Sequence, residues 1–202
     1  MKTAILYAGH SYHHEFLSNE KFRPFYDDSI YLLDLPKVDL TTYDLLIIPA
    51  RTNQDYLYEH KDKFLHFLNE GKWLISLGEI YRPWLPNTGW EFCKTNFNWW
   101  IKEGGELPLI APDPRHQLFN YINIDDARWH YHGVFFPPEG ARVILKNDHG
   151  GAIIYEDDNS FQGKLVATTL DPSYHIGAGF IPQTEKFLYG FLKWIQDEYK
   201  DS

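Results

Sequence analysis

Cysteine is nearly absent from this chain of 202 residues, which contains only Cys93. A single thiol excludes an internal disulfide framework and a cysteine-rich metal site. A signal-peptide pattern is also missing, because the first residues, MKTAILYAGH, combine one lysine with only a short apolar run. The most apolar segment, residues 45–50, is far too short to cross a bilayer. We therefore expect a cytoplasmic protein without a membrane partner.

Runs of lysine and arginine are missing too, and the net charge of −9 disfavours nucleic acid as a partner. Aromatic residues are abundant by contrast, at 17% of the chain with seven tryptophans, several of them between Trp84 and Trp100. Two interpretations stay open, since aromatic rings dominate both cores and binding sites. The rings either fill the core or form a flat wall for a sugar or another planar ligand.

Short apolar runs predict buried strands at residues 3–8, 29–35, 43–50 and 72–78. Between the last two, residues 54–71 place apolar side chains on one helical face and end in glycine. Strands that alternate with helices indicate a mostly parallel sheet covered by helices on both faces. The predicted class is therefore a three-layer, flavodoxin-like α/β fold.

The second half of the chain is regular only in part. Residues 141–170 predict three short strands, and residues 183–199 predict an amphipathic closing helix. Residues 79–133 have no long periodic run and are too long for a plain connection, so we expect a structured, aromatic-rich insertion over one edge of the sheet. No repeat or linker divides the chain, which predicts a single domain over residues 1–202.

Four polar segments follow the predicted strands: GHSYHH, RTNQD, GEIYRPW and DPSYHIG. Ligands of open α/β sheets bind at the carboxyl ends of the strands. If the strands are parallel, these four segments meet in one crevice.

These segments, in this order, resemble the class I glutamine amidotransferase-like superfamily, and within it the ThuA-like branch, named for trehalose utilisation. The similarity is carried by AILYAGHSYHH at the start, YDLLIIPA and LNEGKWLISLGE in the middle, and GKLVATTLDPSYHIG before the last helix. It spans most of the chain in outline, except residues 79–133. The resemblance implies the α/β fold described above.

Working glutaminases of this superfamily carry a cysteine at a tight strand-to-helix turn, with a histidine base and an orienting carboxylate two residues after it. A thiol needs such a base because only the thiolate is a good nucleophile. The matching turn here carries Glu79 in place of cysteine, and the residue two after His175 is Gly177. Cys93 lies well past the turn and is expected to be a packed thiol. We therefore expect no glutaminase activity.

Glu79 and His175 are the two candidate catalytic residues. A carboxylate directly after a buried strand is partly desolvated, which suits it to general acid or base catalysis. The alternative is that Glu79 caps a helix or pairs with Arg51 or Arg82. Asp171, four residues before His175, could orient its imidazole, and the glycines after it could expose backbone N–H groups to an anion. The alternative is a plain turn.

The candidate ligand-binding residues lie in the same four segments. Arg51 suits bidentate contacts, although it could simply neutralise Glu79, and Asn53 could bind a hydroxyl or cap the next helix. Trp84 could stack on a sugar ring or belong to the core. The full set of expected ligand-binding residues is His10, His13, Arg51, Asn53, Trp84, Asp171 and Tyr174.

We expect no resident cofactor, with a divalent metal at a histidine cluster as the open alternative. His10, one of His13 and His14, His175 and Glu79 could converge as ligands, and His130 and His132 add a further pair. None of these spacings is a specific metal signature.

The sequence thus predicts a ThuA-like protein that binds a small polar metabolite, plausibly derived from a carbohydrate, with acid–base or hydrolytic chemistry at Glu79 and His175. The alternative is a non-catalytic binding or assembly module with a degenerate site and an aromatic interface. Association into a homo-oligomer is compatible with both.

Overall fold

A central sheet of ten strands organises the computed structural model, which describes residues 1–93, 97 and 99–202. The main strand order is β2-β1-β3-β4-β10-β9-β7-β5, while β8 pairs with β9 and β6 pairs with β8. The strands are β1 (Thr3–Tyr7), β2 (Asp28–Tyr31), β3 (Leu45–Ile48), β4 (Trp73–Leu77), β5 (Gly89–Phe92), β6 (Leu109–Ile110), β7 (Gly133–Phe136), β8 (Arg142–Asn147), β9 (Ala152–Asp157) and β10 (Lys164–Thr168).

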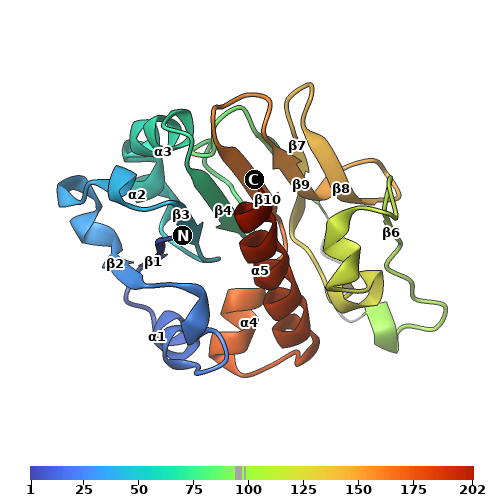
Figure 1. Cartoon of the computed structure of the whole chain (residues 1–202). Helices are drawn as coiled ribbons and strands as arrows, with labels where there is room; N and C mark the ends of the chain where they lie inside the picture. Colours follow the sequence, from blue (N-terminus) through green and yellow to red (C-terminus); the bar gives the residue numbers. More distant parts are fainter. Residues whose placement is uncertain (94–96, 98) are drawn as a thin grey trace.

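Strands β2, β1, β3, β4 and β10 pair in parallel, whereas every pairing from β9 to β5 is antiparallel. The parallel half corresponds to the apolar runs recognised in the sequence, because strands covered on both faces need apolar side chains on both. The predicted α/β sheet is confirmed, although the sheet is mixed, with the antiparallel strands making up one whole side of it (Figure 1).

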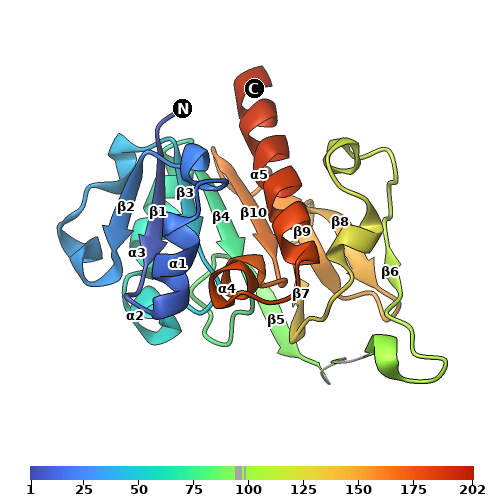
Figure 2. The ribbon, with the colours of Figure 1, turned by 90° about the horizontal axis from the view of Figure 1, so that it is seen from below.

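Helices cover both faces of the parallel half. They are α1 (Ser11–Ser18), α2 (Gln54–Glu59), α3 (Lys61–Asn69), α4 (Pro172–Ala178) and α5 (Gln183–Asp201). Figures 1 and 2 show α1, α4 and α5 on one face and α2 and α3 on the other. None of the described helices has the length and apolarity needed to span a membrane.

The two faces bury separate sets of side chains, as the twofold periodicity of a strand requires. Along β3, Leu45 and Ile47 belong to the core that contains the apolar side of α5, and Leu46 and Ile48 belong to the core under α2 and α3. Burial of large side chains such as these contributes about 1.5–3 kcal/mol each. Packing on both faces therefore fixes where the carboxyl ends of the strands lie.

Several predicted boundaries differ from the observed ones. The strand expected at residues 29–35 ends at Tyr31, where a 3-10 helix (Leu32–Lys37) containing Pro36 begins. The single helix expected over residues 54–71 is divided into α2 and α3 at His60.

Residues 79–133 add to the sheet as well as covering it. Strand β5 pairs with β7 at the end of the sheet, and short 3-10 helices pack against α5. Apolar periodicity could not indicate these elements, since they are only two to four residues long.

Candidate functional site

Both Ser-Tyr-His segments begin helices, where the sequence suggested loops. Helix α1 starts at Ser11, directly after β1, and α4 starts at Pro172, shortly after β10. The two helices pack closely, because a Cβ atom at Gly177 would lie 1.8 Å from the carbonyl oxygen of Tyr12. Gly177 therefore allows the two helices to pack. The N–H groups of Gly179 and Phe180, which were expected to face an anion, donate to the carbonyls of Ile176 and His175 at 3.2 and 3.1 Å.

A cluster of ion pairs lies at the carboxyl ends of β3, β4 and β10. The guanidinium of Arg51 lies 2.9 Å from Oε1 of Glu79 through Nη1 and 3.3 Å from Oδ2 of Asp171 through Nη2. The ring of Tyr174 lies 4.8 Å below the same guanidinium. These residues come from three of the four segments that were expected to converge.

Two features of the backbone position this cluster. Arg51 has a φ of +65°, in the left-handed region that side chains other than glycine rarely adopt. Gly78, which precedes Glu79, has a φ of +92°, and a Cβ atom there would lie 2.8 Å from Cβ of Ala50. Glycine at this turn thus lets the chains after β3 and β4 approach closely enough for Arg51 to reach Glu79.

Histidine side chains extend the cluster. His175 lies one helical turn after Asp171, and its Nε2 is 3.0 Å from Oδ1 of Asp171 and 3.3 Å from Nε2 of His130. His132 lies on the other side, with Nε2 at 3.4 Å from Nη2 of Arg51. His130, Asp171 and His175 are all nearly fully buried.

Burial and charge shift the protonation of this group. Burial lowers the pKa of His130 to about 4, despite the opposing charge of Asp171. Burial alone would raise the pKa of Asp171, but the contact with His175 and the charges of His130 and Arg51 outweigh it and lower the pKa to about 2. At neutral pH, Asp171 is therefore a carboxylate and His130 is a neutral imidazole.

Little in the sequence indicated that His130 and His132 belong to this cluster. They were noted only as a pair with an HxH spacing, on a segment outside the four expected ones. They reach the carboxyl edge because the residues before β7 cross beside the end of β10, where Oγ1 of Thr169 donates a 2.9 Å hydrogen bond to the carbonyl of Gly133.

Three of the predicted ligand-binding residues have other roles in the structure. His13 is buried, with Nδ1 accepting from the N–H of Ala8 at 3.0 Å and Nε2 donating to the carbonyl of Ala50 at 2.9 Å. Asn53 caps α2 by accepting from the N–H of Tyr56. Trp84 is 2% exposed and packs edge-on against Phe64 in the core. Neither His13 nor Trp84 is therefore available to a ligand of this cluster.

His10 is exposed beside the cluster, with its ring stacked on Tyr12 at 5.0 Å between centroids. Together with the buried His13, this corrects the expected metal set, because neither His10 nor the histidines of α1 converge with Glu79 and His175 among the described residues. The described group whose donor atoms do converge is His130, Asp171 and His175.

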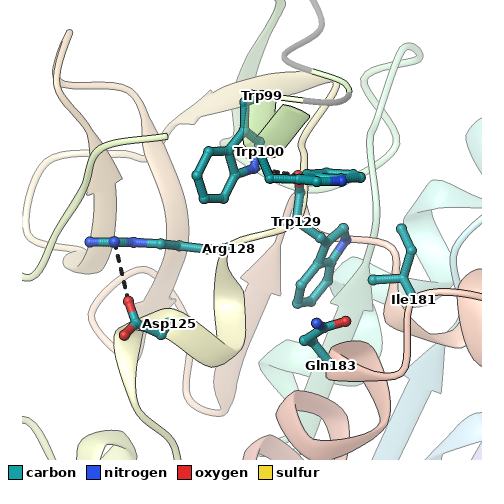
Figure 3. A pocket seen from close by; sticks show the side chains of 7 residues that line it. All are labelled: Trp99, Trp100, Asp125, Arg128, Trp129, Ile181 and Gln183. Atoms are coloured by element: carbon teal, nitrogen blue, oxygen red, sulfur yellow. Dashed lines mark hydrogen bonds and ion pairs between the residues drawn. The ribbon is translucent and has the colours of Figure 1, made fainter. Parts of the chain in front are cut away.

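Two cavities flank the histidines. One, of about 220 Å³, is bordered by His175, Phe180 and Ile181. The other, of about 550 Å³, is shown in Figure 3 and is lined by Trp99, Trp100, Asp125, Arg128, Trp129, Ile181 and Gln183. Trp129 separates the larger cavity from His175, with the two ring centroids 6.5 Å apart.

The larger cavity combines aromatic rings with hydrogen-bonding groups. Nε1 of Trp99 donates to the carbonyl of Trp129 at 3.0 Å, and Arg128 pairs with Asp125 at 3.2 Å (Figure 3). Of the two interpretations of the aromatic residues, the core applies to Trp84, Trp129 and Trp194, which are at most 2% exposed. Trp99, Trp100 and Trp129 also line this cavity, whereas Trp84 does not.

No family model and no curated protein matches this chain. Solved structures do match it in fold. A GMP synthase subunit protein from Thermoplasma acidophilum superimposes with a TM-score of 0.60 at 9% identity, over 99% of this chain and 96% of that one. A glutamine amidotransferase from Thermotoga maritima gives a TM-score of 0.56 at 11% identity, over 100% of this chain and 84% of that one.

A third match is a glycosidase. The exo-β-1,4-mannosidase Op5Man5 from Opitutaceae bacterium strain TAV5 has a TM-score of 0.50 and 11% identity over 94% of this chain, which spans only 35% of the mannosidase. At these identities the likeness concerns the fold. The chain thus has the mixed α/β fold of class I glutamine amidotransferases.

Proposed function

We propose that this chain is a ThuA-like protein that binds a small polar, carbohydrate-derived metabolite at the carboxyl edge of its parallel strands. Acid–base or hydrolytic chemistry takes place there around Glu79 and His175, without glutaminase activity. The observation that carries the proposal is the guanidinium of Arg51, which joins Glu79 to Asp171 beside His175.

The strained backbone of Arg51 supports a role for its side chain. A left-handed conformation costs a residue with a Cβ atom about 1–3 kcal/mol, and such strain clusters at ligand sites. Glycine would adopt the same turn without that cost. The position therefore suits a guanidinium that must reach two carboxylates at once.

Glu79 has capacity left for a ligand. Oε1 accepts from Arg51, whereas Oε2 is buried without a hydrogen-bond partner among the described residues. An unpaired buried carboxylate oxygen costs about 1–3 kcal/mol, a cost that a ligand hydroxyl donating to it would relieve. Sugar hydroxyls are donors of this kind.

The cavities are consistent with the size and class of this ligand. The 220 Å³ cavity is bordered by His175 and not by Glu79 or Arg51, so it bears on the proposal only through His175. Its volume is smaller than the roughly 300–1,000 Å³ of sites for drug-sized molecules, which favours a small metabolite. The neighbouring tryptophan cavity offers ring faces with a charged pair and an amide, a combination that suits the apolar and hydroxyl faces of a sugar.

The environment of Cys93 argues against thiol chemistry. Burial raises the pKa of its thiol, which disfavours the thiolate, and its backbone N–H donates to the carbonyl of His132 at 3.0 Å. The residue after Gly78, where the family's glutaminases carry their nucleophile, is Glu79. Glutamine hydrolysis would lack an activated nucleophile.

A ligand screen tests the proposal directly. Neutral monosaccharides, sugar acids and disaccharides are added to the protein, and those that raise its Tm are selected. The affinity of each selected compound is then measured by calorimetry. We expect the native chain to bind. Glu79→Gln should lose at least about tenfold in affinity, because it removes the negative charge that faces Arg51. Glu91→Gln, at an exposed carboxylate on β5, should leave the affinity unchanged.

Two results would overturn this assignment. One is the absence of any hit in the native chain, and the other is equal affinity in Glu79→Gln. Ammonia release from glutamine by the native chain, lost in Cys93→Ser, would establish the glutaminase that we exclude. Trp100→Ala separates the two cavities, because only a ligand that reaches the tryptophan cavity loses affinity in this variant.

A non-catalytic assembly module is the second candidate, favoured by the exposed apolar end of the sheet. Phe92, on β5, is 62% exposed, and Ile101 is 72% exposed. Phe136, on the paired strand β7, is 50% exposed but lies opposite Gly89, so it is on the other face of the sheet from Phe92. Phe92 is the side chain on which this candidate rests, because a partner that adds to this end of the sheet would cover it. Analytical ultracentrifugation of the native chain and of Phe92→Glu tests it: a dimer that the variant dissociates supports assembly through this surface, and monomers in both exclude self-assembly there.

A further inference from the structure

Three donor atoms from two segments face one another at the centre of the cluster. They belong to His130, before β7, to Asp171, the N-cap of α4, and to His175 within α4, and they all lie within 4.8 Å of one another. All three side chains are at least 97% buried. Such groups are rarely brought together away from water without a partner that satisfies them.

Hydrogen bonding within the group cannot satisfy all three atoms. Nε2 of His175 faces both Nε2 of His130, at 3.3 Å, and Oδ1 of Asp171, at 3.0 Å. A ring nitrogen carries either one hydrogen or one lone pair, so it can serve only one of these neighbours. If it donates to Asp171, the two imidazole nitrogens face each other without a shared proton.

A metal ion would satisfy all three at once. Two ligands at about 2.0–2.2 Å from a tetrahedral zinc ion lie about 3.4 Å apart, which follows from the tetrahedral angle. The observed separations of 3.0 and 3.3 Å around Nε2 of His175 are close to this value. Small side-chain rotations would therefore place the three atoms at bonding distance.

The surrounding charges favour a cation. One guanidinium, that of Arg51, faces the two carboxylates of Glu79 and Asp171, which leaves one negative charge in excess when the imidazoles are neutral. The two oxygens of Asp171 have different neighbours: Oδ2 contacts Arg51, and Oδ1 faces the histidines. Outer contacts of this kind orient the carboxylates that bind metals.

We infer that His130, Asp171 and His175 form a binding site for a divalent transition metal of the zinc class, with a fourth position left for water or a ligand. Two imidazoles and one carboxylate are a donor set that suits zinc and its neighbours better than calcium or magnesium. The site differs from the one expected from the sequence, since it uses His130 and none of the histidines of α1.

This site deepens the proposed function, on which its catalytic part rests, and changes the role of His175 from proton transfer to metal binding. With Nε2 of His175 bound to the metal, His175 acts as a ligand and the free carboxylate oxygen of Glu79 is left as the proton acceptor. A metal-bound water has a pKa near 7 in such sites, which suits hydrolysis. Metal binding itself does not depend on the metabolite, so the two proposals can fail separately.

The test is metal binding by the full chain, expressed without a histidine tag and stripped with a chelator. Zn²⁺ and Co²⁺ are titrated by calorimetry, and Co²⁺ also by visible absorption, which detects a low-coordinate site. We expect one equivalent of each ion and a higher Tm in its presence. His130→Gln should lower the metal affinity at least about tenfold. Even the loss of a residue that only hydrogen-bonds to a metal ligand has an effect of this size, and His130 is proposed as a ligand itself.

His14→Gln is the matched control, because His14 is an exposed histidine of α1 at the same edge of the sheet. It keeps the native affinity if the inference holds. The inference is overturned if the stripped native chain binds less than one equivalent, or if His14→Gln loses the metal while His130→Gln keeps it. Circular dichroism of the variants shows whether they fold, and His175→Gln replaces His130→Gln if that variant does not.

The ligand screen distinguishes this inference from the proposed function. Metal bound by a chain that binds no sugar supports the site and rejects the metabolite. Sugar bound equally well before and after chelation, with no metal taken up, rejects the site alone.

Discussion

The guanidinium of Arg51, on the turn after β3, lies 2.9 Å from the carboxylate of Glu79, which follows β4. The two residues are distant in sequence and meet because their strands are parallel neighbours. The same guanidinium contacts Asp171 after β10, so one side chain connects the carboxyl ends of three parallel strands.

Arg51→Ala and Arg51→Gly both remove the guanidinium, but they differ in the backbone. Alanine keeps the strained φ of +65° and glycine relieves it. We expect Arg51→Ala to be less stable than Arg51→Gly by about 1 kcal/mol, the usual difference for a left-handed residue. Urea unfolding of both variants measures this difference, and equal stabilities would contradict the strain.

The buried imidazole of His13 makes stability depend on pH near neutrality. Burial lowers its pKa in the folded chain below the ordinary value of 6.5, although the bond to the carbonyl of Ala50 opposes the shift. The unfolded chain then binds more protons, so stability is fully present above pH 6.5 and is lost as the pH falls below it. Free energies of unfolding between pH 7.5 and 5 should decline less steeply in His13→Gln, and an unchanged slope would exclude His13 as the cause.

A second buried ion cluster controls stability in acid. Burial alone would raise the pKa of Glu156, but hydrogen bonds from His116 and Lys164 outweigh it and lower the pKa from 4.5 to about 2. Lys164 lies 2.6 Å from Oε2 of Glu156, and both side chains are nearly fully buried. This depressed pKa contributes stability above pH 4.5, which is lost as the pH falls toward 2.

The variant Glu156→Gln should therefore lose on the order of 3 kcal/mol at pH 7, since each unit of pKa shift corresponds to about 1.4 kcal/mol. It should differ much less from the native chain near pH 2. Glu139→Gln, an exposed carboxylate, is the control. A constant difference between native chain and variant across this range would contradict the linkage.

Gly177→Ala should separate α1 from α4. The added Cβ atom would lie 1.8 Å from the carbonyl oxygen of Tyr12, a backbone atom that cannot move alone. We expect a loss of at least about 2 kcal/mol in chemical unfolding, within the range for overpacked sites. Gly179→Ala, with open space around its Cβ, should lose only about 1 kcal/mol through its left-handed φ of +75°. Equal losses would mean that the helices have room to shift.

The sequence by itself determined the parallel half of the fold. Apolar runs such as residues 43–50 and 72–78 must be buried on both faces, and the helical periodicity between them supplies the cover. The same reasoning placed Arg51, Glu79, Asp171 and His175 at one edge, because parallel strands share the direction of their carboxyl ends. The sequence also suggested that Asp171 orients His175, although the helix α4 that brings the two side chains together was not expected.

Only the tertiary structure decided which other side chains join them. His130 and His132 come from a segment before β7 with no apolar periodicity, so nothing local predicts that it crosses beside β10. His13 and Trp84 were expected at the site and are buried among backbone carbonyls and core rings instead. The physical reason is that strand direction is encoded in short-range patterns, whereas burial of a polar side chain depends on long-range contacts that short-range patterns do not specify.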